Sequence, residues 1–475
     1  MNKDLEDILK ILSLYKKKDG TIEDTRLILY KICEKTEDQE RADKYEYFSK
    51  HSSECIEKFN GLFDQISARC RENKCDDCHI NKWCNHYRNV KQSEESCSDG
   101  PIYADFFCGA GGLSWGFHRA GYRMSLANDI QECCVDTMAL NHPEVSGNHI
   151  IAADINDVLD NIKILSKYDE VDVVVGGPPC QGFSMANRQR IIDDPRNHLY
   201  KSFIKAIDIL KPTFFVMENV RGMLGAKQQI VEDFLNIGYT ATAHILNAKD
   251  FGVPQNRERV FFIGNRLQID NEEIFGDIFK IAAGRSDFVL EDALQGLPSL
   301  KAKTQANATE LEDNESGYTF AINDDKDRNT YIDSINEGRS MPVLFNHKAR
   351  YNNQRDIEIF GRMNPGDNSA DPKIADIMPY KRREKIFKDK YYKLEFTKPC
   401  KTITAHMKYD CNMYIHPSQA RGLTPREAAR VQSYPDDYYF RGAYTKTYMQ
   451  VGNSVPPLLS EAIATALKKK IEEIR

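Results

Sequence analysis

The sequence predicts an α/β protein built on a doubly wound, mostly parallel sheet. From Pro101 onward, short apolar runs alternate with amphipathic helical patterns, which is typical of consecutive βαβ units. The candidate strands are residues 102–107, 124–128, 150–153, 171–175, 214–218, 241–246 and 260–263, and the candidate helices are 113–120, 133–140, 200–210 and 230–235. Because ligands bind beyond the carboxyl ends of such strands, functional residues are expected directly after them.

Length and composition narrow the class of protein. The chain has 475 residues, enough for two or three folding units, and its 41% hydrophobic and 29% charged residues exclude a disordered or collagen-like chain. No apolar run approaches the roughly 20 residues of a membrane span, so no membrane partner is expected. The first residues mix acids and bases where a secretory signal would be apolar, which predicts a cytoplasmic location. The net charge of -6 still allows a local basic groove.

The pattern divides the chain into four parts. Residues 1–100 read as a helical extension that holds seven of the 13 cysteines, and residues 101–267 carry the strand–helix alternation. Residues 268–395 are polar and break the alternation, and they include a basic run with interleaved aromatics at 380–393, which is expected to contact phosphates. Residues 396–475 regain regular structure and end in a helix at 458–474.

The segment DFFCGAGGLSWGF (105–117) reads as a strand, a glycine-rich turn and a helix. Gly109, Gly111 and Gly112 would let the backbone approach a nucleotide-like ligand. Asp129 and Asp154 end the next two strands, where an acid can bind ribose hydroxyls. Helix capping is the alternative interpretation of each acid.

The segment VDVVVGGPPCQGFS (171–184) is more specific. An apolar strand leads to Cys180 on a turn stiffened by two prolines, which presents the thiol rigidly, as a nucleophile requires. Glu218 ends the neighbouring strand, FFVMENV, and would lie near Cys180. In QNRERVFFIG, Gln255, Arg257 and Arg259 alternate, so they would face one side, either as a solvated edge or as an anion site.

These segments, in this order, resemble the motifs of the bacterial-type C5-cytosine DNA methyltransferases. DFFCGAGG matches the cofactor loop, GGPPCQGFS the nucleophile loop, ENV the acid motif and QNRERVF the arginine motif, while RGLTPREAARVQSYPD (421–436) and QVGNSVPP (450–457) match two closing motifs. The resemblance covers about 101–267 and 396–475, and 268–395 corresponds to the family's variable target-recognition region. It implies a Rossmann-like, S-adenosylmethionine-dependent methyltransferase fold.

The resemblance also implies the reaction. The enzyme would transfer a methyl group from S-adenosylmethionine to C5 of a cytosine flipped out of a specific sequence in double-stranded DNA. Cys180 would attack C6, Glu218 would bind N3 and the exocyclic amine, and Arg259 would orient the base with help from Arg257. The setting would be restriction-modification or epigenetic marking, in which a cognate restriction endonuclease can act separately.

For the cofactor, the resemblance places Phe107 on the adenine, Asp129 on the ribose and Asp154 on the adenine amino group. The full set that it implies is Phe107, Gly109, Gly111, Gly112, Asp129, Ile130, Asp154, Ile155, Pro179, Leu199, Asn453, Ser454 and Val455. The sequence departs from the family in two places. Cys108 stands where Ala or Ser is common, and Asp129 replaces a Glu, which shortens the reach but keeps the charge.

The run CRENKCDDCHINKWC (70–84) predicts a metal centre formed by Cys70, Cys75, Cys78 and Cys84. A structural zinc site is one interpretation, with His79 or His86 as substitute ligands. The segment is also similar to the iron–sulfur loop of endonuclease III-like glycosylases, and this similarity favours a [4Fe-4S] cluster. The similarity covers the loop alone and implies no glycosylase activity. Four free thiols are the third interpretation.

Three other functions compete with DNA methylation. A tRNA cytosine-5 methyltransferase would share the fold, although the Cys-Phe-Thr tripeptide typical of that branch is absent. A catalytically silent DNA-binding relative would not need Cys180, Glu218 and Arg259 intact. A nicotinamide dehydrogenase would leave Cys180 and the closing motifs unexplained.

Overall fold

The computed structural model describes residues 100–142, 145, 149–160, 170–179, 199–306, 312–322, 327–339, 341, 343–379 and 390–475. Four sequence predictions fall outside these residues: the helical extension up to residue 99, the metal ligands Cys70, Cys75, Cys78 and Cys84 within it, the nucleophile Cys180, and residues 380–389 of the basic run.

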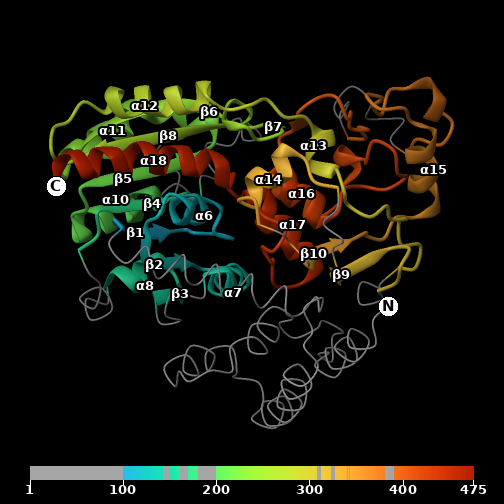
Figure 1. Ribbon diagram of the computed structural model, residues 1–475, viewed down its shortest axis with the longest axis horizontal. Coiled ribbons are helices and arrows are strands. Elements are labelled where there is room, and N and C mark those ends of the chain that lie inside the picture. Colours follow the sequence, from blue (N-terminus) through green and yellow to red (C-terminus); the bar gives the residue numbers. More distant parts are fainter. Residues whose placement is uncertain are drawn as a thin grey trace, which may run out of the picture.

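A mostly parallel sheet forms the centre of the larger lobe, as predicted (Figure 1). Within the described residues it has seven strands in the order β3-β2-β1-β4-β5-β8-β6. Their bounds are Ile102–Phe106 for β1, Arg123–Asp129 for β2, Ile150–Ala152 for β3, Val173–Gly176 for β4, Phe214–Asn219 for β5, Thr240–Asn247 for β6 and Glu258–Asn265 for β8. The first five strands in this order run parallel, and β8 is antiparallel to both of its neighbours.

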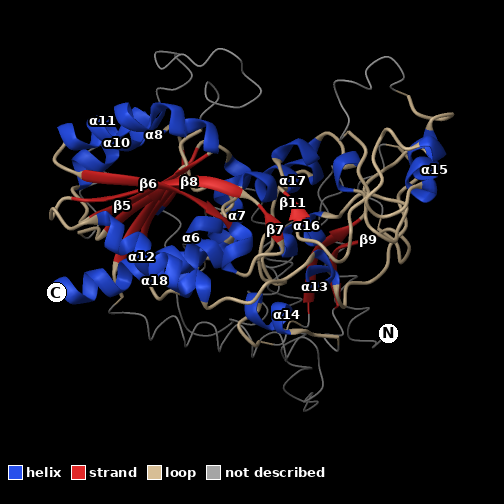
Figure 2. Ribbon diagram, turned by 90° about the horizontal axis from the view of Figure 1, so that it is seen from above, coloured by secondary structure: helices blue, strands red, loops and turns tan. Residues whose placement is uncertain are grey.

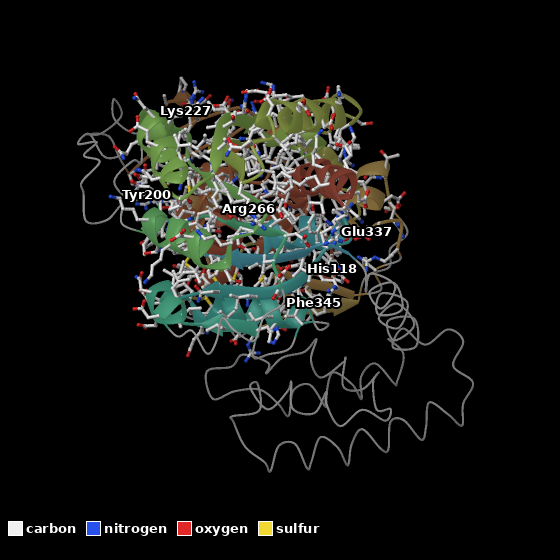
Figure 3. All side chains as sticks on the ribbon, turned by 90° about the vertical axis from the view of Figure 1, so that its left-hand side faces the viewer. His118, Tyr200, Lys227, Arg266, Glu337 and Phe345 are labelled. Atoms are coloured by element: carbon white, nitrogen blue, oxygen red, sulfur yellow. The ribbon has the colours of Figure 1, made fainter. Side chains whose placement is uncertain are left out.

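Helices cover both faces of the sheet (Figure 2). One face carries α6 (Gly112–Arg119), α12 (Asn271–Ala283) and α18 (Pro457–Ile474), and the other carries α8 (Ile155–Asp160), α10 (Leu199–Leu210) and α11 (Lys227–Asn236). The short η3 (Arg221–Ala226) and η4 (Ala248–Phe251) follow β5 and β6, and α7 (Glu132–Asn141) follows β2. Viewed from the side, Tyr200 and Lys227 lie toward one face and His118 toward the other (Figure 3).

Two apolar layers result from the alternation of side chains along the strands. Val173 and Val175 belong to the cluster that packs against α6, α12 and α18, whereas Val174 belongs to the cluster under α8, α10 and α11. Because both faces are buried, the strands read as continuous apolar runs in the sequence.

The C-terminal helix returns to the first βα unit. The hydroxyl of Ser460 on α18 donates to the Leu113 carbonyl of α6 (2.6 Å), and the hydroxyl of Tyr122 donates to the Ala464 carbonyl (3.0 Å). Helix α12, capped by the carboxylate of Asp270, covers the same face. It lies in a stretch that the polar sequence had suggested to be irregular.

A smaller lobe lies beside the sheet (Figure 1). Its elements are α13 (Leu290–Leu294), β9 (Gly317–Ile322), α14 (Thr330–Ile335), β10 (Val343–Lys348), α15 (Gln354–Arg362), η5 (Pro372–Ile374), η6 (Ala405–Lys408), η7 (Asn412–Tyr414), α16 (Pro425–Val431) and α17 (Tyr444–Asn453). Strand β9 pairs antiparallel with β10. The pair β7 (Gln255–Asn256) and β11 (Cys400–Lys401) joins the chain before β8 to this lobe.

Polar contacts also hold the two lobes together. Arg119, at the end of α6, forms ion pairs with Glu337 of the smaller lobe (3.2 Å) and with Glu461 of α18 (3.3 Å). Figure 3 shows Glu337 on the same side of the molecule as His118.

The structure corrects the phosphate-contact prediction for one residue of the basic run. Lys393 is only 6% exposed, and its ammonium donates to the carbonyls of Phe360 and Met363, each at 2.9 Å. Because the charge is used to hold the end of α15, this lysine does not face a phosphate. None of the helices in the described part of the chain is long and apolar enough to cross a membrane.

Candidate active site

The predicted functional residues follow the strands at one edge of the sheet. Phe106 of β1 is level with Asn128 of β2 and with Gly176 of β4, and Gly176 is level with Met217 of β5. The carboxyl ends of these parallel strands therefore meet at a single edge, where such sheets bind ligands.

Glu218 and Arg259 form an ion pair at this edge. Glu218 is the last residue but one of β5, and Arg259 lies near the start of the antiparallel β8, so neighbouring strands bring the two side chains together. The Nε atom of Arg259 is 3.0 Å from Oε1 of Glu218, and both side chains are largely buried. Burial raises the pKa of Glu218, and the charges of Arg259 and Arg257 oppose that rise without cancelling it. The carboxyl group therefore takes up a proton more readily than an exposed glutamate.

The segment that leads to Cys180 is held against this acid. A Cβ atom on Gly177 would lie only 3.1 Å from Oε2 of Glu218, so the backbone passes the carboxylate closely. The Nδ2 atom of Asn219 donates to the carbonyl of Pro178 at 2.9 Å. These contacts place Pro179, the residue before Cys180, beside the acid motif, as the predicted strand order requires.

Arg257 has a different environment from Arg259. Its side chain is buried and donates to the carbonyls of Ile403 (2.6 Å) and Gly452 (3.2 Å). Gln255 accepts a hydrogen bond from the Ile403 amide at 2.8 Å. The three alternating residues of QNRER thus have different partners. Gln255 and Arg257 bind backbone groups of residues 403 and 452, and Arg259 binds Glu218.

The glycine-rich turn holds Asp129 in place. Oδ2 of this residue accepts from the Gly109 amide at 3.0 Å, and Oδ1 accepts from the Gln131 amide at 2.8 Å. Burial raises the pKa of Asp129, and these backbone hydrogen bonds oppose the rise. Phe107, which precedes the turn, has a positive φ of 59°, an uncommon conformation for a residue with a Cβ. The turn therefore carries the aromatic residue and holds the acid at the end of β2 against it.

The three glycines of the turn differ in what a side chain would meet at each position. A Cβ on Gly109 would meet no described atom within 4 Å, so this side of the turn is open. A Cβ on Gly111 would lie 2.1 Å from Sδ of Met138, and one on Gly112 would lie 2.2 Å from the Val455 carbonyl. Packing within the protein thus explains Gly111 and Gly112, and the close approach brings the closing motif onto the turn.

The remaining predicted cofactor residues lie around this turn. Asp154 caps α8 by accepting from the Asn156 amide at 2.8 Å, which is one of the two roles expected for it. Ile130 is 63% exposed. Ile155 and Val455 are buried, Pro179 and Asn453 are exposed, and Leu199 begins α10. The Oγ of Ser454 lies 2.6 Å from the hydroxyl of Tyr434.

This arrangement fits a nucleoside-containing cofactor. The open side of the turn at Gly109 lies beside the fixed carboxylate of Asp129, which can accept hydrogen bonds from sugar hydroxyls. Phe107 and the exposed Ile130 offer apolar surface for a planar ring. Among the described residues, no group of three or more His, Cys, Asp or Glu side chains could hold a metal ion.

One buried acid was missed by the sequence reasoning. Asp105, on β1, accepts from the hydroxyl of Ser114 (2.5 Å), while Oδ1 of Asp105 has no partner among the described residues. Burial raises the pKa of Asp105 to about 8, so its carboxyl group is largely protonated near neutral pH. Its place as the first residue of DFFCGAGG was the available signal.

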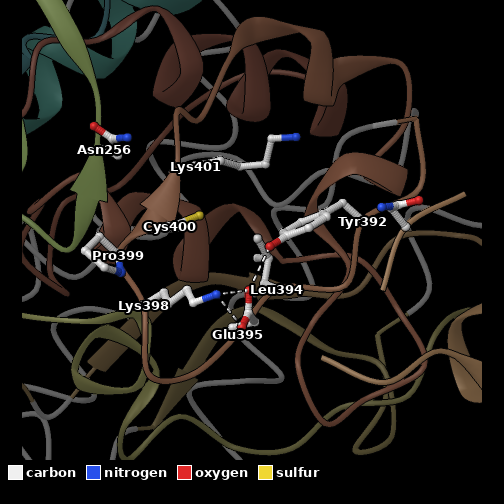
Figure 4. Close-up of a pocket in the computed structure, with 9 residues that line it drawn as sticks. Asn256, Tyr392, Leu394, Glu395, Lys398, Pro399, Cys400 and Lys401 are labelled. Carbon is white, nitrogen blue, oxygen red and sulfur yellow. Dashed lines mark hydrogen bonds and ion pairs between the residues drawn. The ribbon is translucent and has the colours of Figure 1, made fainter. Parts of the chain in front are cut away.

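A separate pocket of about 390 Å³ lies beside the β7–β11 pair (Figure 4). Its lining contains none of the predicted catalytic or cofactor residues and consists of Asn256, Asn368, Tyr392, Leu394, Glu395, Lys398, Pro399, Cys400 and Lys401. The ammonium of Lys401 lies 5.2 Å from the centre of the Tyr392 ring. The pocket is therefore distinct from the edge that carries Glu218 and Asp129.

Comparisons with known proteins show the family of the chain. A family model described as C-5 cytosine-specific DNA methylase matches residues 103–469. The chain is 36% identical to the Type II methyltransferase M.DdeI of Desulfomicrobium norvegicum, over 78% of this chain and 89% of that protein. It is 34% identical to the Type II methyltransferase M1.HphI of Haemophilus parahaemolyticus, over 77% and 86%. The crystal structure of a prophage-encoded DNA modification methyltransferase from E. coli aligns with a TM-score of 0.60 and 25% identity, covering 78% of this chain and all of that one.

Proposed function

The chain belongs to the C-5 cytosine-specific DNA methylase family, and from that premise we propose how its residues methylate DNA. The enzyme is a DNA (cytosine-5-)-methyltransferase, which moves a methyl group from S-adenosylmethionine to C5 of cytosine. The observation that carries the assignment of roles is the Glu218–Arg259 ion pair beside the segment that leads to Cys180.

Cys180 is the nucleophile in this scheme. Its thiolate bonds to C6 of the cytosine, and the electrons of the C5–C6 double bond then make C5 nucleophilic. S-adenosylmethionine, when bound, would supply the methyl group that C5 takes up, and S-adenosylhomocysteine would be the leaving group. A base afterwards removes the proton from C5, and the electrons of that C–H bond restore the double bond as the cysteine leaves.

Glu218 supports the attack by holding a proton at N3 of the ring. Negative charge enters the ring when the thiolate bonds to C6, and a protonated carboxyl group can share its proton with N3 to stabilise that charge. The buried position of Glu218 favours the protonated form, and its contact with Arg259 fixes the direction of the carboxyl group. Arg259, which lies beside the acid, would orient the cytosine.

Arg257 is a positioning residue in this proposal. Its two carbonyl contacts hold Ile403 and Gly452, the second of which begins the segment from 452 to 455 that packs on the cofactor turn. The loss of Arg257 would therefore act through the closing motif rather than through direct contact with the cytosine.

The cofactor would lie on the open side of the turn at Gly109. Asp129 would accept hydrogen bonds from the ribose, and Phe107 and Ile130 would contact the adenine. Asp154, Ile155, Pro179, Leu199, Asn453, Ser454 and Val455 complete the proposed set, and Gly111 and Gly112 contribute by allowing the turn to pack.

The substrate in this proposal is a cytosine flipped out of double-stranded DNA, because C6 is inaccessible in a stacked helix. We assign sequence recognition to residues 268–395, except α12, which packs on the sheet. Since the relatives are named Type II methyltransferases, we also propose a role in restriction-modification, with a cognate endonuclease acting separately on the same sequence.

The proposed metal centre of the first 100 residues rests on the cysteine spacing and on the similarity of that segment to an iron–sulfur loop. We retain Cys70, Cys75, Cys78 and Cys84 as its ligands, with a [4Fe-4S] cluster favoured over zinc. It would stabilise the N-terminal extension and take no part in methylation.

Sequencing DNA from cells that express the protein tests the proposed function. Long-read or bisulfite sequencing should reveal 5-methylcytosine at one recurrent sequence, and the mark should vanish in cells that express Cys180→Ser. Unmodified DNA in cells with soluble wild-type protein would contradict the proposal. Methylated tRNA in the absence of methylated DNA would show that the substrate is tRNA and not DNA.

A further inference from the structure

An exposed aromatic side chain directly follows η6, and we call residues 405–410, which comprise η6 and the two residues after it, the rim loop. Tyr409 is 67% exposed, the highest value for a large hydrophobic residue in the described part of the chain. No motif of the sequence analysis includes this loop. A single exposed side chain is common on protein surfaces, so the position of this ring and the charges around it decide what it can bind.

The rim loop begins next to the active site. The carbonyl of Ile403 accepts a hydrogen bond from Arg257, which is two residues before Arg259 in the alternating motif. The next two residues pack so closely on Gly452 that a Cβ there would lie 2.2 Å from the Ala405 amide nitrogen. Residues 454 and 455, which follow Gly452 closely, pack on the cofactor turn, so the start of the rim loop contacts the segment that closes the site.

The smaller lobe holds the backbone of the rim loop in place. The guanidinium of Arg350 donates to the carbonyls of Met407 and Tyr409, each at 2.8 Å. The Met407 side chain is fully buried. The loop thus presents Tyr409 in a fixed position, which reduces the entropy lost when a partner binds.

Charges around the ring suit a nucleic acid. The ammonium of Lys408 lies 4.7 Å from the centre of the Tyr409 ring, and the His406 ring is 5.4 Å away. One acid is also present, since Asp410 lies 3.8 Å from Nε2 of His406. A cation beside an aromatic face matches a phosphate next to an exposed base, because bases stack on aromatic rings and phosphates attract lysine.

We propose that Tyr409 stacks on a base that becomes exposed when the target cytosine leaves the double helix, while Lys408 contacts a neighbouring phosphate. Flipping removes one base from the stack and uncovers the faces of those beside it, which then need a new stacking partner. The rim loop supplies that partner at the border of the active site. This inference rests on the proposed function, because it requires a flipped cytosine.

The test compares Tyr409→Ala, Tyr409→Phe and Lys408→Ala with the wild type on unmethylated DNA that contains the sequence that the enzyme methylates. Phe279→Ala is the matched control, since Phe279 is 44% exposed on α12, on the face of the sheet. Fluorescence of 2-aminopurine at the target position reports flipping, and titration over a range of salt concentrations reports affinity. S-adenosylmethionine binding confirms that each variant is folded.

Tyr409→Ala should weaken DNA binding about tenfold and reduce the 2-aminopurine signal, with an unchanged salt slope. Tyr409→Phe should match the wild type, because phenylalanine keeps an aromatic ring at position 409. Phe279→Ala should also match it, because Tyr409 is unchanged in that variant. Lys408→Ala should flatten the salt slope by about one unit. Wild-type affinity and flipping in Tyr409→Ala, while the wild type methylates DNA, would overturn this inference alone. A wild type that methylates no DNA would overturn it together with the proposed function.

Discussion

The guanidinium of Arg259 and the carboxylate of Glu218 are 3.0 Å apart, on neighbouring strands that run in opposite directions. This antiparallel pairing brings a residue at the start of β8 to the same edge as the end of β5. The acid, its cation and the segment before Cys180 therefore come together at the carboxyl edge of an otherwise parallel sheet.

Glu218→Gln should lower the turnover number by about 10²- to 10⁴-fold, because an amide cannot release a proton to N3. S-adenosylmethionine affinity should stay near the wild-type value, since Asp129 and the glycine-rich turn are unchanged. Steady-state kinetics and cofactor titration measure the two quantities. Glu272→Gln, at an exposed acid on α12, is the control and should behave as the wild type. Full turnover in Glu218→Gln would remove this acid from the chemistry.

Gly112→Ala should destabilise the protein by about 1–3 kcal/mol and weaken cofactor binding, because the added methyl group would overlap the Val455 carbonyl at the turn. Gly276→Ala is the matched control. A Cβ at Gly276 meets no described atom within 4 Å, and alanine favours a helix by up to about 1 kcal/mol. Chemical denaturation and cofactor titration check both variants. Equal effects of the two substitutions would contradict the packing explanation.

Much of the larger lobe could be predicted from local patterns. Each predicted strand is present within a few residues of its expected bounds, because strands buried on both faces must be apolar throughout. The neighbouring positions of Glu218 and the nucleophile segment followed from strand order. Helix α12 was missed, since its apolar face, with Ile274, Phe275 and Ile278, is interrupted by charged residues.

The contacts of the site were less predictable because they join distant parts of the chain. Arg257 binds carbonyls at 403 and 452, and Gly112 packs on Val455. No local sequence pattern predicts a hydrogen bond between an arginine and a backbone carbonyl that is far away in the sequence. The rim loop was missed for the same reason, because the position of Tyr409 depends on Arg350 of the smaller lobe.

The buried pair Arg421–Glu427, 2.6 Å apart, should make stability depend on pH. Burial alone would raise the pKa of Glu427, but Arg421 holds it well below its ordinary value of 4.5. The ionised carboxylate therefore stabilises the folded state above about pH 4.5, and this contribution is lost as the pH falls below that value.

Glu427→Gln should cost about 3–5 kcal/mol of unfolding free energy at neutral pH, because Arg421 stays buried without its counter-ion. The difference from the wild type should shrink below pH 4.5. Glu315→Gln breaks the exposed pair with Lys301 and should leave stability nearly unchanged. Urea titrations at several pH values measure this, and a pH-independent loss would refute the electrostatic explanation.

The N-terminal cysteines should bind one metal centre. Anaerobically purified protein should be brown, with about four irons and four sulfides per chain for the cluster, whereas one zinc and no colour would select the alternative. Elemental analysis decides between them. The double variant Cys75→Ala, Cys78→Ala should lose the metal and keep S-adenosylmethionine binding, and full metal content in that variant would show that other residues are the ligands.

Covalent trapping tests the central claim, that Cys180 attacks a cytosine in DNA. The wild-type enzyme, incubated with S-adenosylmethionine and DNA carrying 5-fluorocytosine at the methylated position, should form a complex that survives denaturant, because fluorine cannot leave C5 as a proton does. Mass spectrometry should place the bond on Cys180, and Cys180→Ser should form no such complex while still binding S-adenosylmethionine. An active wild-type enzyme that forms no trapped complex, or one trapped through another residue, would contradict the account.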